Sequence, residues 1–454
     1  MAMGEADHTG LRGDSGVLLR VGNGSVIGYD ATGLVLRLSD RVVEDLRGRL
    51  GILPGAGAAQ PWVDPAVLGD IDAWNVARRG AWYHFDAALP GYDHPRRFRR
   101  LVAGGHVVAE AAGPLQAVLS IGGARRAWSV PGRAAFPAHV VCPGDDIGAV
   151  GVAGVEPALA TAALEQAREM TLDTLVADAL LARRRASGRA LPLIVARCES
   201  DNSGSAPALA SGMAVANLEQ AIANIVAAAG ALGVAARVLA VAIDYGAEDV
   251  VSDCAGFVGG IRALMARVAE YLGAQGLGAP VFVMRADETG ARVREHWDLA
   301  MFPGDHRLVF SAPGYAFDFD ANHRPCAATL RVMAEAEADA IEAALARRPW
   351  HCPRLLLAEA DAPGQVRVTT DALSSLVLDR TLGAGVDHGF VLAQGDVSVP
   401  VDRVTVAPDD KCAVLLHHGA TGPAEMRFAV GRAGGLRDDA GRWALPAILP
   451  VGGC

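Results

Sequence analysis

The sequence has little lysine, few aromatic residues and no excess of positive charge. Its 41 lysines and arginines are outnumbered by 51 acidic residues, which gives a formal net charge of −10 at pH 7. A nucleic-acid-binding surface needs a basic face to contact phosphates, so we expect no nucleic-acid partner. Two arginine clusters, 96–100 and 183–185, read as solvated edges, and the first could also serve an anionic glycan.

Cysteine pairing motifs and leader segments are also missing. The seven cysteines are scattered, odd in number and without a C-x-x-C pair, so we expect neither a disulfide framework nor a zinc site, and no metal or cofactor. Residues 1–16 contain no apolar core of a signal peptide, which predicts synthesis in the cytoplasm. The longest apolar stretch, 222–243, contains glycines and an arginine, so it reads as a buried helix and strand and predicts no membrane span.

What the chain does have is length and hydrophobic content. With 454 residues and 51% hydrophobic composition it can bury large cores, and we expect two or three globular domains. Residues 1–130 read as strands and turns separated by Pro- and Gly-rich linkers, with predicted strands at 17–21, 33–38 and 115–121. No chemistry is legible in this region, and we expect a β-rich attachment or accessory domain. Its aromatic residues serve as core anchors or as platforms for sugar stacking: Trp62, Trp74, Trp82 and Tyr83.

Residues 131–347 alternate between strand and helix patterns. The predicted strands are 138–142, 191–196, 237–243, 280–284 and 307–310. The predicted helices are a long stretch from about 159 to 185, then 214–230, 255–273 and 326–346. This alternation is typical of an α/β domain with an open parallel sheet, whose ligands bind beyond the carboxyl ends of the strands. Four polar turns are expected at that edge: 144–148, 201–205, 244–249 and 318–323.

From residue 348 to 454 the helical patterns stop. Short strands follow at regular spacing, including 366–369, 376–379, 389–392, 397–406 and 412–416. This spacing predicts a small C-terminal β-sandwich.

The last polar turn carries a candidate acid–base pair. Asp320 and His323 lie three residues apart, and a carboxylate at that distance can orient an imidazole and stabilise its charged form, as a general base requires. The alternative is that Asp320 caps the helix that begins near Pro325.

The order of these turns, closing in D-x-x-H, resembles the SGNH (GDSL-like) hydrolases. It is most similar to the phage and prophage branch of sialate O-acetylesterase-like proteins, found in tail fibres and spikes. The resemblance covers about 138–454 and leaves 1–130 uncovered. Three stretches after the α/β domain are similar to recurrent elements of that branch: Leu376–Asp379, Asp387–Phe390 and Gly434–Asp438. The fold it implies is an SGNH-type parallel sheet flanked by helices, followed by the sandwich and preceded by the β-rich domain.

The resemblance also implies roles for single residues. Active members carry their nucleophilic serine in the first turn, where Asp146 of Gly144-Asp145-Asp146 stands here, and a carboxylate cannot form the usual acyl-enzyme. Gly204 matches the glycine whose backbone N–H serves the oxyanion hole, and Tyr245 replaces an amide donor. Asp320 and His323 match the orienting acid and the base. These matches imply a site that has lost its nucleophile and one donor.

Other interpretations of these turns remain open. Ser203 or Ser205 could be a displaced nucleophile that acts with His323. Asp146 and His323 could activate a water molecule directly, or Asp146 could cap a helix or form an Asx-turn.

The leading functional hypothesis is a catalytically degenerate SGNH-fold protein that binds surface glycan, a capsular or acetylated polysaccharide. It would be a spike or fibre component of a phage-like particle, such as a gene transfer agent head spike, made in the cytoplasm and released with the particle. The N-terminal domain would attach it to another subunit. Further candidates for the glycan cleft are Asp145, Asn202, Asp249 and Asn322. The alternatives are an active carbohydrate O-acetylesterase that uses Ser203 or Ser205, and a purely structural subunit.

Overall fold

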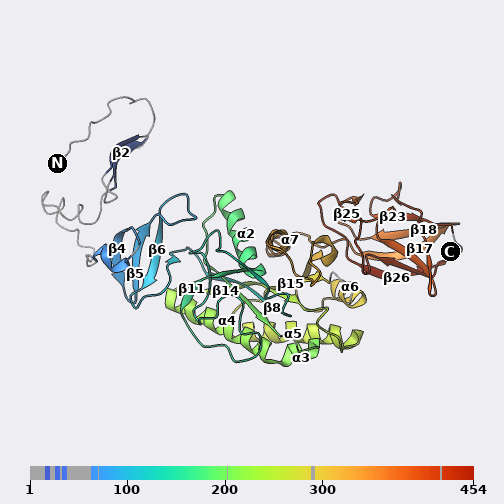
Figure 1. Ribbon diagram of the computed structural model, residues 1–454, viewed down its shortest axis with the longest axis horizontal. Coiled ribbons are helices and arrows are strands. Elements are labelled where there is room, and N and C mark those ends of the chain that lie inside the picture. Colours follow the sequence, from blue (N-terminus) through green and yellow to red (C-terminus); the bar gives the residue numbers. More distant parts are fainter. Residues whose placement is uncertain are drawn as a thin grey trace. The chain divides into compact units, whose positions relative to one another are not determined.

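The computed structural model of the protein describes residues 16–20, 26–30, 33–37, 63–69, 71–201, 203–287, 292–419 and 422–453, the first three ranges by their backbone only. The chain divides into two compact units, Met1–Glu110 and Ala111–Cys454 (Figure 1). Both contain β-sheets, and the second is a mixed α/β unit.

The first unit is β-rich, as the sequence predicts. Three antiparallel strands form one sheet: β1 (Gly16–Arg20), β2 (Val26–Asp30) and β3 (Gly33–Arg37). A short 3-10 helix, η1 (Pro65–Leu68), precedes a second antiparallel sheet of β4 (Ala73–Arg79), β5 (Trp82–Ala87), β6 (Arg96–Leu101) and β7 (Val108–Ala109). Phe85 and Phe98 are fully buried between β5 and β6, with ring centroids 6.2 Å apart. Apolar pairs of this kind stabilise neighbouring strands.

The second unit is built on a seven-stranded sheet. Its order is β11 (Leu164–Gln166), β10 (Val140–Pro143), β13 (Ile194–Ser200), β8 (Leu115–Gly122), β14 (Ala236–Asp244), β15 (Val281–Ala286) and β16 (Leu308–Pro313). All neighbours pair in parallel except β11, which runs antiparallel to β10. The parallel sheet predicted from strand–helix alternation is therefore present.

Strand β8 corrects the predicted domain boundary at residue 130. The sequence analysis assigned 115–121 to the N-terminal domain, whereas β8 lies in the sheet between β13 and β14 with all eight residues buried. An apolar run identifies a buried strand but does not identify its partners. No helix separates β8 from the next strand of the sheet, so the alternation pattern missed it.

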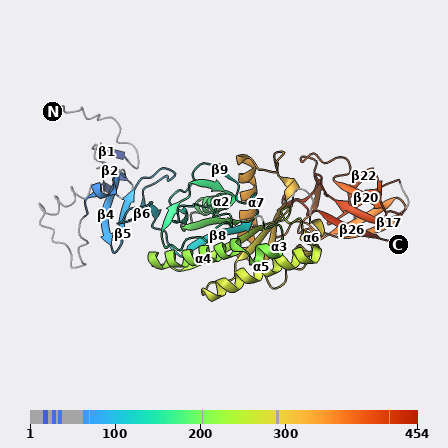
Figure 2. The ribbon, with the colours of Figure 1, turned by 60° about the horizontal axis from the view of Figure 1, so that its bottom comes forward.

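Helices cover both faces of this sheet (Figures 1 and 2). On one face, α2 (Leu172–Ala186) and α7 (Ala327–Leu345) pack against each other and against the sheet. On the other, α4 (Met213–Leu232) packs on β8 and β13, and α3 (Ala206–Ser211) and α5 (Cys254–Ala274) lie beside it. A sixth helix, α6 (Val293–Met301), packs on α5. The predicted helices 214–230, 255–273 and 326–346 are thus confirmed within two residues.

The predicted helix from residue 159 begins later. Helix α2 starts at Leu172, where the Thr171 side chain accepts a hydrogen bond from the Thr174 N–H, and β9 (Ser129–Pro131) pairs with β12 (Glu169–Thr171) just before it. Residues 155–163 instead form an extended strap across α4. Asn217 and Asn224, two turns apart on α4, each exchange hydrogen bonds with the backbone of this strap at 2.8–2.9 Å. The spacing of apolar residues in the strap is similar to that of a helix, which explains the incorrect prediction.

By length and composition α4 is the one helix in the described ranges that could cross a membrane. Half of its apolar window is buried in the structure, and the helix packs on the central sheet. This packing agrees with the expectation of a buried core helix for this apolar stretch.

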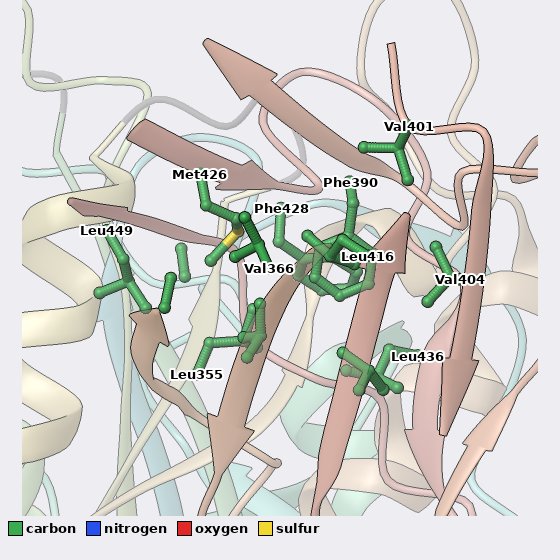
Figure 3. Packing of buried hydrophobic residues seen from close by; sticks show 14 of the residues in the cluster. Leu355, Val366, Phe390, Val401, Val404, Leu416, Met426, Phe428, Leu436 and Leu449 are labelled. Carbon is green, nitrogen blue, oxygen red and sulfur yellow. The ribbon is translucent and has the colours of Figure 1, made fainter. Parts of the chain in front are cut away.

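The C-terminal part is an eight-stranded sheet with a single apolar core (Figure 3). Its strands in sheet order are β21 (Val397–Val399), β20 (Phe390–Gln394), β24 (Glu425–Phe428), β26 (Ala447–Gly452), β17 (Leu355–Ala362), β18 (Gln365–Thr370), β23 (Ala413–His417) and β22 (Arg403–Val406). Figure 3 shows residues of both halves of the sheet, among them Phe390, Met426, Val366 and Leu416, gathered in that core.

The three stretches that carry the family resemblance meet in this part. Strand β19 (Leu376–Leu378) pairs with β25 (Leu436–Asp438), and Arg437 forms an ion pair with Asp379 at 2.7 Å. A Cβ on Gly389 would lie 2.6 Å from the Ala433 carbonyl oxygen, so this glycine permits the third stretch to approach. The motifs are therefore parts of one packing arrangement.

Candidate functional site

The candidate site lies at the carboxyl ends of the central parallel strands. Strands β8 and β14 end side by side, with Gly122 paired with Asp244, and β15 ends nearby at Ala286. Open α/β sheets bind ligands at this edge because polar turns from several strands converge there. The 3-10 turn η2 (Gly314–Ala316) follows β16 and leads into the loop that carries His323.

Two glycines bring the turns after β8 and β14 together. A Cβ on Gly122 would lie 2.3 Å from the Asp244 carbonyl oxygen, and a Cβ on Gly123 would lie 2.4 Å from the Glu248 side chain. The contact at Gly122 is with a backbone atom, so only glycine permits this approach, whereas a Cβ on Gly123 would require the Glu248 side chain to move. The residues that follow are Ala124 and Arg125.

Arg125 links the turns after three strands. Its guanidinium forms ion pairs with Glu248 at 3.0 Å and with Asp287 at 3.1 Å. Both carboxylates also accept backbone N–H groups of the turn after β14, from Gly246 at 3.3 Å and from Ala247 at 3.0 Å. The positions of the charged groups are therefore fixed by hydrogen bonds on both sides.

A second ion pair lies beside this group. Arg285 of β15 contacts the Asp244 carboxylate at 2.9 Å. Burial disfavours the charged form of Asp244, but the nearby cations Arg285, Arg126 and Arg125 outweigh it and lower the pKa of Asp244 below its usual value. The carboxylate stays ionised and paired, which makes it a poor proton acceptor.

Beneath this edge lies a fully buried charge cluster. Arg126 donates to Asp173 of α2 at 2.6 Å and to Glu337 of α7 at 2.5 Å, and Ser120 of β8 donates to the other Asp173 oxygen at 2.6 Å. Burial opposes the charge on Arg126, yet its two carboxylate partners raise its pKa well above the usual value. The cluster joins both helices to the central strand.

These charges leave little open space. A cavity lined by Arg125, Asp244, Arg285 and His323, with apolar residues of the His323 loop and α7, has a volume of about 10 Å³. That is enough for about one water molecule. The structure therefore places His323 next to the ion pairs: its side chain is exposed to solvent, and the cavity that it helps to line is far too small for a sugar.

Asp320 stabilises the turn that carries His323. Its exposed carboxylate accepts backbone N–H groups of Arg324 at 2.9 Å and Asn322 at 2.8 Å, and these bonds lower the pKa of Asp320. His323 itself has a positive φ of 55°. The alternative that Asp320 caps the following helix is wrong, because α7 is capped by the Cys326 side chain, which accepts from the Thr329 N–H.

Gly204 and Tyr245 lie together. Tyr245 is 1% exposed, and its hydroxyl has no regular hydrogen-bond partner among the described residues. Burial raises the pKa of this hydroxyl to about 12, although the nearby backbone N–H of Gly204 acts in the opposite direction. The Tyr245 hydroxyl and the Gly204 amide are therefore close to each other.

The two candidate serines have different surroundings. Ser205 is the N-cap of α3, and its hydroxyl accepts a hydrogen bond from the Ala208 N–H at 3.2 Å. Ser203 is exposed. Asn202 lies outside the described residues.

The first predicted turn follows an outer strand. Asp146 is exposed with a φ of 65°, and β10, which it follows, is separated from β8 by β13. Asp145 was expected to line the glycan cleft. Instead it is 6% exposed and contacts the buried Arg197 at 3.0 Å. Because β8 precedes β10 in the chain, Gly144-Asp145-Asp146 follows the second strand of this sheet in chain order.

Two further cleft candidates have local structural roles. Asp249 is 4% exposed and accepts the Ala206 N–H at the start of α3 at 2.7 Å, while Arg292 pairs with its other oxygen at 3.1 Å. Asp249 was expected to line the cleft, but it is a buried residue that caps the start of α3. Asn322 is exposed in the His323 loop.

Sequence reasoning missed Arg125, Glu248 as its partner, Arg285 and Asp287. A signal was present for the first, because Gly-Gly at the end of the apolar run 115–121 marks a strand end, and Arg125 follows two residues later. The ion pairs themselves join residues 123 and 162 positions apart, a separation that no local pattern reveals. In the described ranges no group of three His, Cys, Asp or Glu side chains is placed to hold a metal ion.

Comparison with known proteins gives a likeness of fold. No family model and no curated protein sequence matches the chain. The structure is similar to that of a carbohydrate acetylesterase from Xanthomonas citri, with a TM-score of 0.52 and 13% identity over 93% of this chain and 90% of that chain. A protein from Arabidopsis thaliana matches 51% of this chain and 98% of its own at 10% identity and a TM-score of 0.37. The first likeness supports an SGNH-like fold.

Proposed function

We propose that this chain is a catalytically degenerate SGNH-fold protein that binds surface glycan. The proposal depends on one observation: the turn after β8 reads Gly122-Gly123-Ala124-Arg125-Arg126 and contains no hydroxyl or thiol group. A covalent esterase mechanism needs a nucleophile at the sheet edge within reach of its base.

The family resemblance gives this turn its meaning. In active SGNH enzymes the nucleophilic serine of G-Q-S follows the first strand of the sheet, and the first strand in chain order here is β8. Ala124 then takes the place of the serine. The proposed loss of the nucleophile stands, but its position moves from Asp146 to Ala124.

The surroundings of His323 support the same proposal. Arg125 and Arg285 are each held by carboxylates, and the cavity beside His323 has room for about one water molecule. Tyr245 is buried close to the Gly204 amide, and we infer that it takes up space that an oxyanion would need. An ester would have neither a nucleophile nor a place for its oxyanion.

The alternative esterase that uses Ser203 or Ser205 has less support. The Ser205 hydroxyl already caps α3, and both serines follow β13, the strand next to β8. Direct attack by water between Asp146 and His323 would require groups that follow β10 and β16, strands five positions apart in the sheet, to meet.

The biological setting extends the proposal further. Similarity of fold to a carbohydrate acetylesterase supports a carbohydrate ligand, here a capsular or acetylated surface polysaccharide. The protein would be a spike or fibre component of a phage-like particle, such as a gene transfer agent head spike. It would be made in the cytoplasm, carried on an extracellular particle and attached through its N-terminal region to another subunit.

Hydrolysis of p-nitrophenyl acetate tests the loss of catalysis. We expect the purified protein and its His323→Ala variant to hydrolyse the ester at the same slow rate as a non-enzymatic protein. Turnover that disappears with His323→Ala would overturn the proposal, and Ser203→Ala and Ser205→Ala would then identify the nucleophile.

A glycan array tests the binding half of the proposal. Retention of the intact protein on surface-type oligosaccharides is the expected result. No retention on any glycan, together with no ester hydrolysis, would leave the purely structural subunit as the explanation.

A further inference from the structure

The larger described cavity lies in the first unit and shares no lining residue with the cavity beside His323. It has a volume of about 570 Å³, within the usual range for small-molecule sites. Strands β4, β5 and β6 and the loop between β5 and β6 contribute its lining: Trp74, Asp86, Asp93, His94, Pro95, Arg96 and Arg97. The lining thus combines an indole ring, two carboxylates and two guanidinium groups.

Strand register places three of these residues in one row. Trp74 of β4 pairs with Asp86 of β5, and Asp86 pairs with Arg97 of β6. Side chains of directly paired residues point to the same face of a sheet. An aromatic ring, a carboxylate and a guanidinium therefore lie side by side on one wall of the cavity.

The polar members of the row are held in place from outside the cavity. Asn75 donates to the Asp86 carboxylate at 2.7 Å. Arg97 contacts Glu110 at 3.0 Å, and His84 contacts the same Glu110 oxygen at 2.9 Å. Side chains held by such bonds lose little conformational freedom when a ligand binds.

Arg96 adds a donor without a protein acceptor. Its guanidinium lies 5.6 Å from the centre of the Tyr92 ring, and its Nε atom is buried with no hydrogen-bond partner in the described part of the chain. A buried donor that lacks an acceptor is costly unless a ligand or water supplies one. The Nε atom is closed to a ligand in this structure, and Arg96 contributes to the cavity lining through its other atoms.

We infer that this cavity is a binding site for an uncharged pyranose unit of a surface polysaccharide. The half-buried Trp74 ring provides a flat apolar surface for the C–H groups of a sugar ring. The carboxylates of Asp86 and Asp93 accept hydrogen bonds from sugar hydroxyl groups, and Arg96 donates to a ring or hydroxyl oxygen. Two acids and two arginines give the lining no net charge from these groups, so it has no general preference for an anionic sugar.

This inference rests on the proposed function and gives it a location. The cavity beside His323 measures about 10 Å³, whereas the one beside Trp74 measures about 570 Å³. Of these two cavities, the second is large enough to hold a sugar ring. Glycan recognition would then belong to the first unit, and the α/β sheet would keep a fold whose former site is filled.

The test compares four forms of the full-length chain on one glycan array. The array presents neutral hexose and deoxyhexose oligosaccharides beside uronate- and sialate-containing ones. The forms are the unmodified protein, Trp74→Ala, Asp86→Asn and the matched control His323→Ala. Asp86→Asn retains the size of the side chain, so it keeps the test decisive if Trp74→Ala fails to fold. Binding is repeated in about 0.5 M NaCl, where charge-driven contacts are screened.

The expected result is retention on neutral glycans in both salts, unchanged in His323→Ala and weakened at least about tenfold in Trp74→Ala and Asp86→Asn. Binding that survives both cavity substitutions would overturn the inference and leave the proposed function intact. Binding to anionic glycans alone, lost in salt, would overturn it as well. Absence of any binding by the unmodified protein would overturn the proposed function itself.

Discussion

Arg126 and Glu337 form a buried ion pair, with their side-chain atoms 2.5 and 3.1 Å apart and both side chains at most 5% exposed. The pair ties the turn after β8 to helix α7, and Asp173 ties the same guanidinium to α2 at 2.6 Å. Burial of a carboxylate raises the pKa of Glu337, and Arg126 opposes this. Beneath the edge of the sheet, Arg126, Asp173 and Glu337 are therefore buried and paired with one another.

Removal of Arg126 should be strongly destabilising. Arg126→Ala leaves Asp173 and Glu337 buried without their cation, and we expect a loss of about 3–5 kcal/mol in the free energy of unfolding. Urea unfolding measures it. Arg183→Ala is the matched control, because Arg183 joins the same two helices through Glu335, Asp339 and Glu342 near the surface. It should cost about 1 kcal/mol or less, and equal losses would contradict the assignment.

Alanine substitutions of the two candidate serines should change the free energy of unfolding by different amounts and leave ester hydrolysis unchanged. Ser205→Ala removes the N-cap of α3, and we expect a loss of about 0.5–2 kcal/mol. Ser203→Ala, at an exposed position, should change the free energy of unfolding by less than about 0.5 kcal/mol. Thermal unfolding and p-nitrophenyl acetate hydrolysis of both variants check these expectations. A fall in hydrolysis for either variant would favour the esterase hypothesis.

The strap over α4 should loosen when its two asparagines are replaced. Asn217→Ala and Asn224→Ala each remove hydrogen bonds to the strap backbone and leave polar groups without partners, at a cost of about 1–3 kcal/mol each. Limited proteolysis should then cut within residues 155–163 at a higher rate. Gln220→Ala is the control on the same helix, because its amide contacts Asn224 and not the strap. A cleavage rate equal to that of the control would show that the strap is held by other contacts.

Neighbouring glycines in α5 should respond in opposite directions to the same substitution. A Cβ on Gly260 would lie 2.5 Å from the backbone nitrogen of Pro207 in α3, so Gly260→Ala forces the helices apart and destabilises the protein. A Cβ on Gly259 would meet no atom within 4 Å, so Gly259→Ala should stabilise the helix by about 0.5–1 kcal/mol. Melting temperatures of both variants provide the measurement. Two shifts of the same sign would contradict the packing of α3 on α5.

Asp178 should make stability depend on pH. This α2 residue accepts the backbone N–H groups of Ala135 and Phe136, and burial raises the pKa of its carboxyl group to about 6. A raised pKa means that the folded state binds the proton more tightly than the unfolded state, so protonation stabilises the fold as the pH falls through 6. Relative to Asp178→Asn, the unmodified protein should gain about 1 kcal/mol between pH 7 and pH 5. Chemical unfolding at both pH values measures this difference, and a constant difference would refute the assignment.

Local patterns predicted much of the fold. The helices α4, α5 and α7 begin and end within two residues of their predicted limits, because helical periodicity and end signals act over a few residues. The strand alternation also predicted the parallel sheet and its polar edge. Helix α2 was predicted too long, because the strap of residues 155–163 has apolar residues at helix-like spacing without being helical.

The candidate site depended on pairing between distant segments. The D-x-x-H turn and the polar turns near Gly204 and Tyr245 are legible in the sequence, but the turn that lies against them was chosen wrongly. Membership of β8 in the sheet is decided by its backbone pairing with β13 and β14, and the proposal that Ala124 takes the place of the nucleophile depends on that pairing.

Composition and periodicity are properties of neighbouring residues, so an acidic chain with an α/β middle, a β-rich start and a β-rich end can be predicted without a structure, and the D-x-x-H turn at His323 can be read directly. Three features cannot be predicted in that way: the contacts of Arg125 with Glu248 and Asp287, the small cavity beside His323, and the cavity wall shared by Trp74, Asp86 and Arg97. Strand register and long-range ion pairs decide these features, and both arise from packing between segments far apart in the chain.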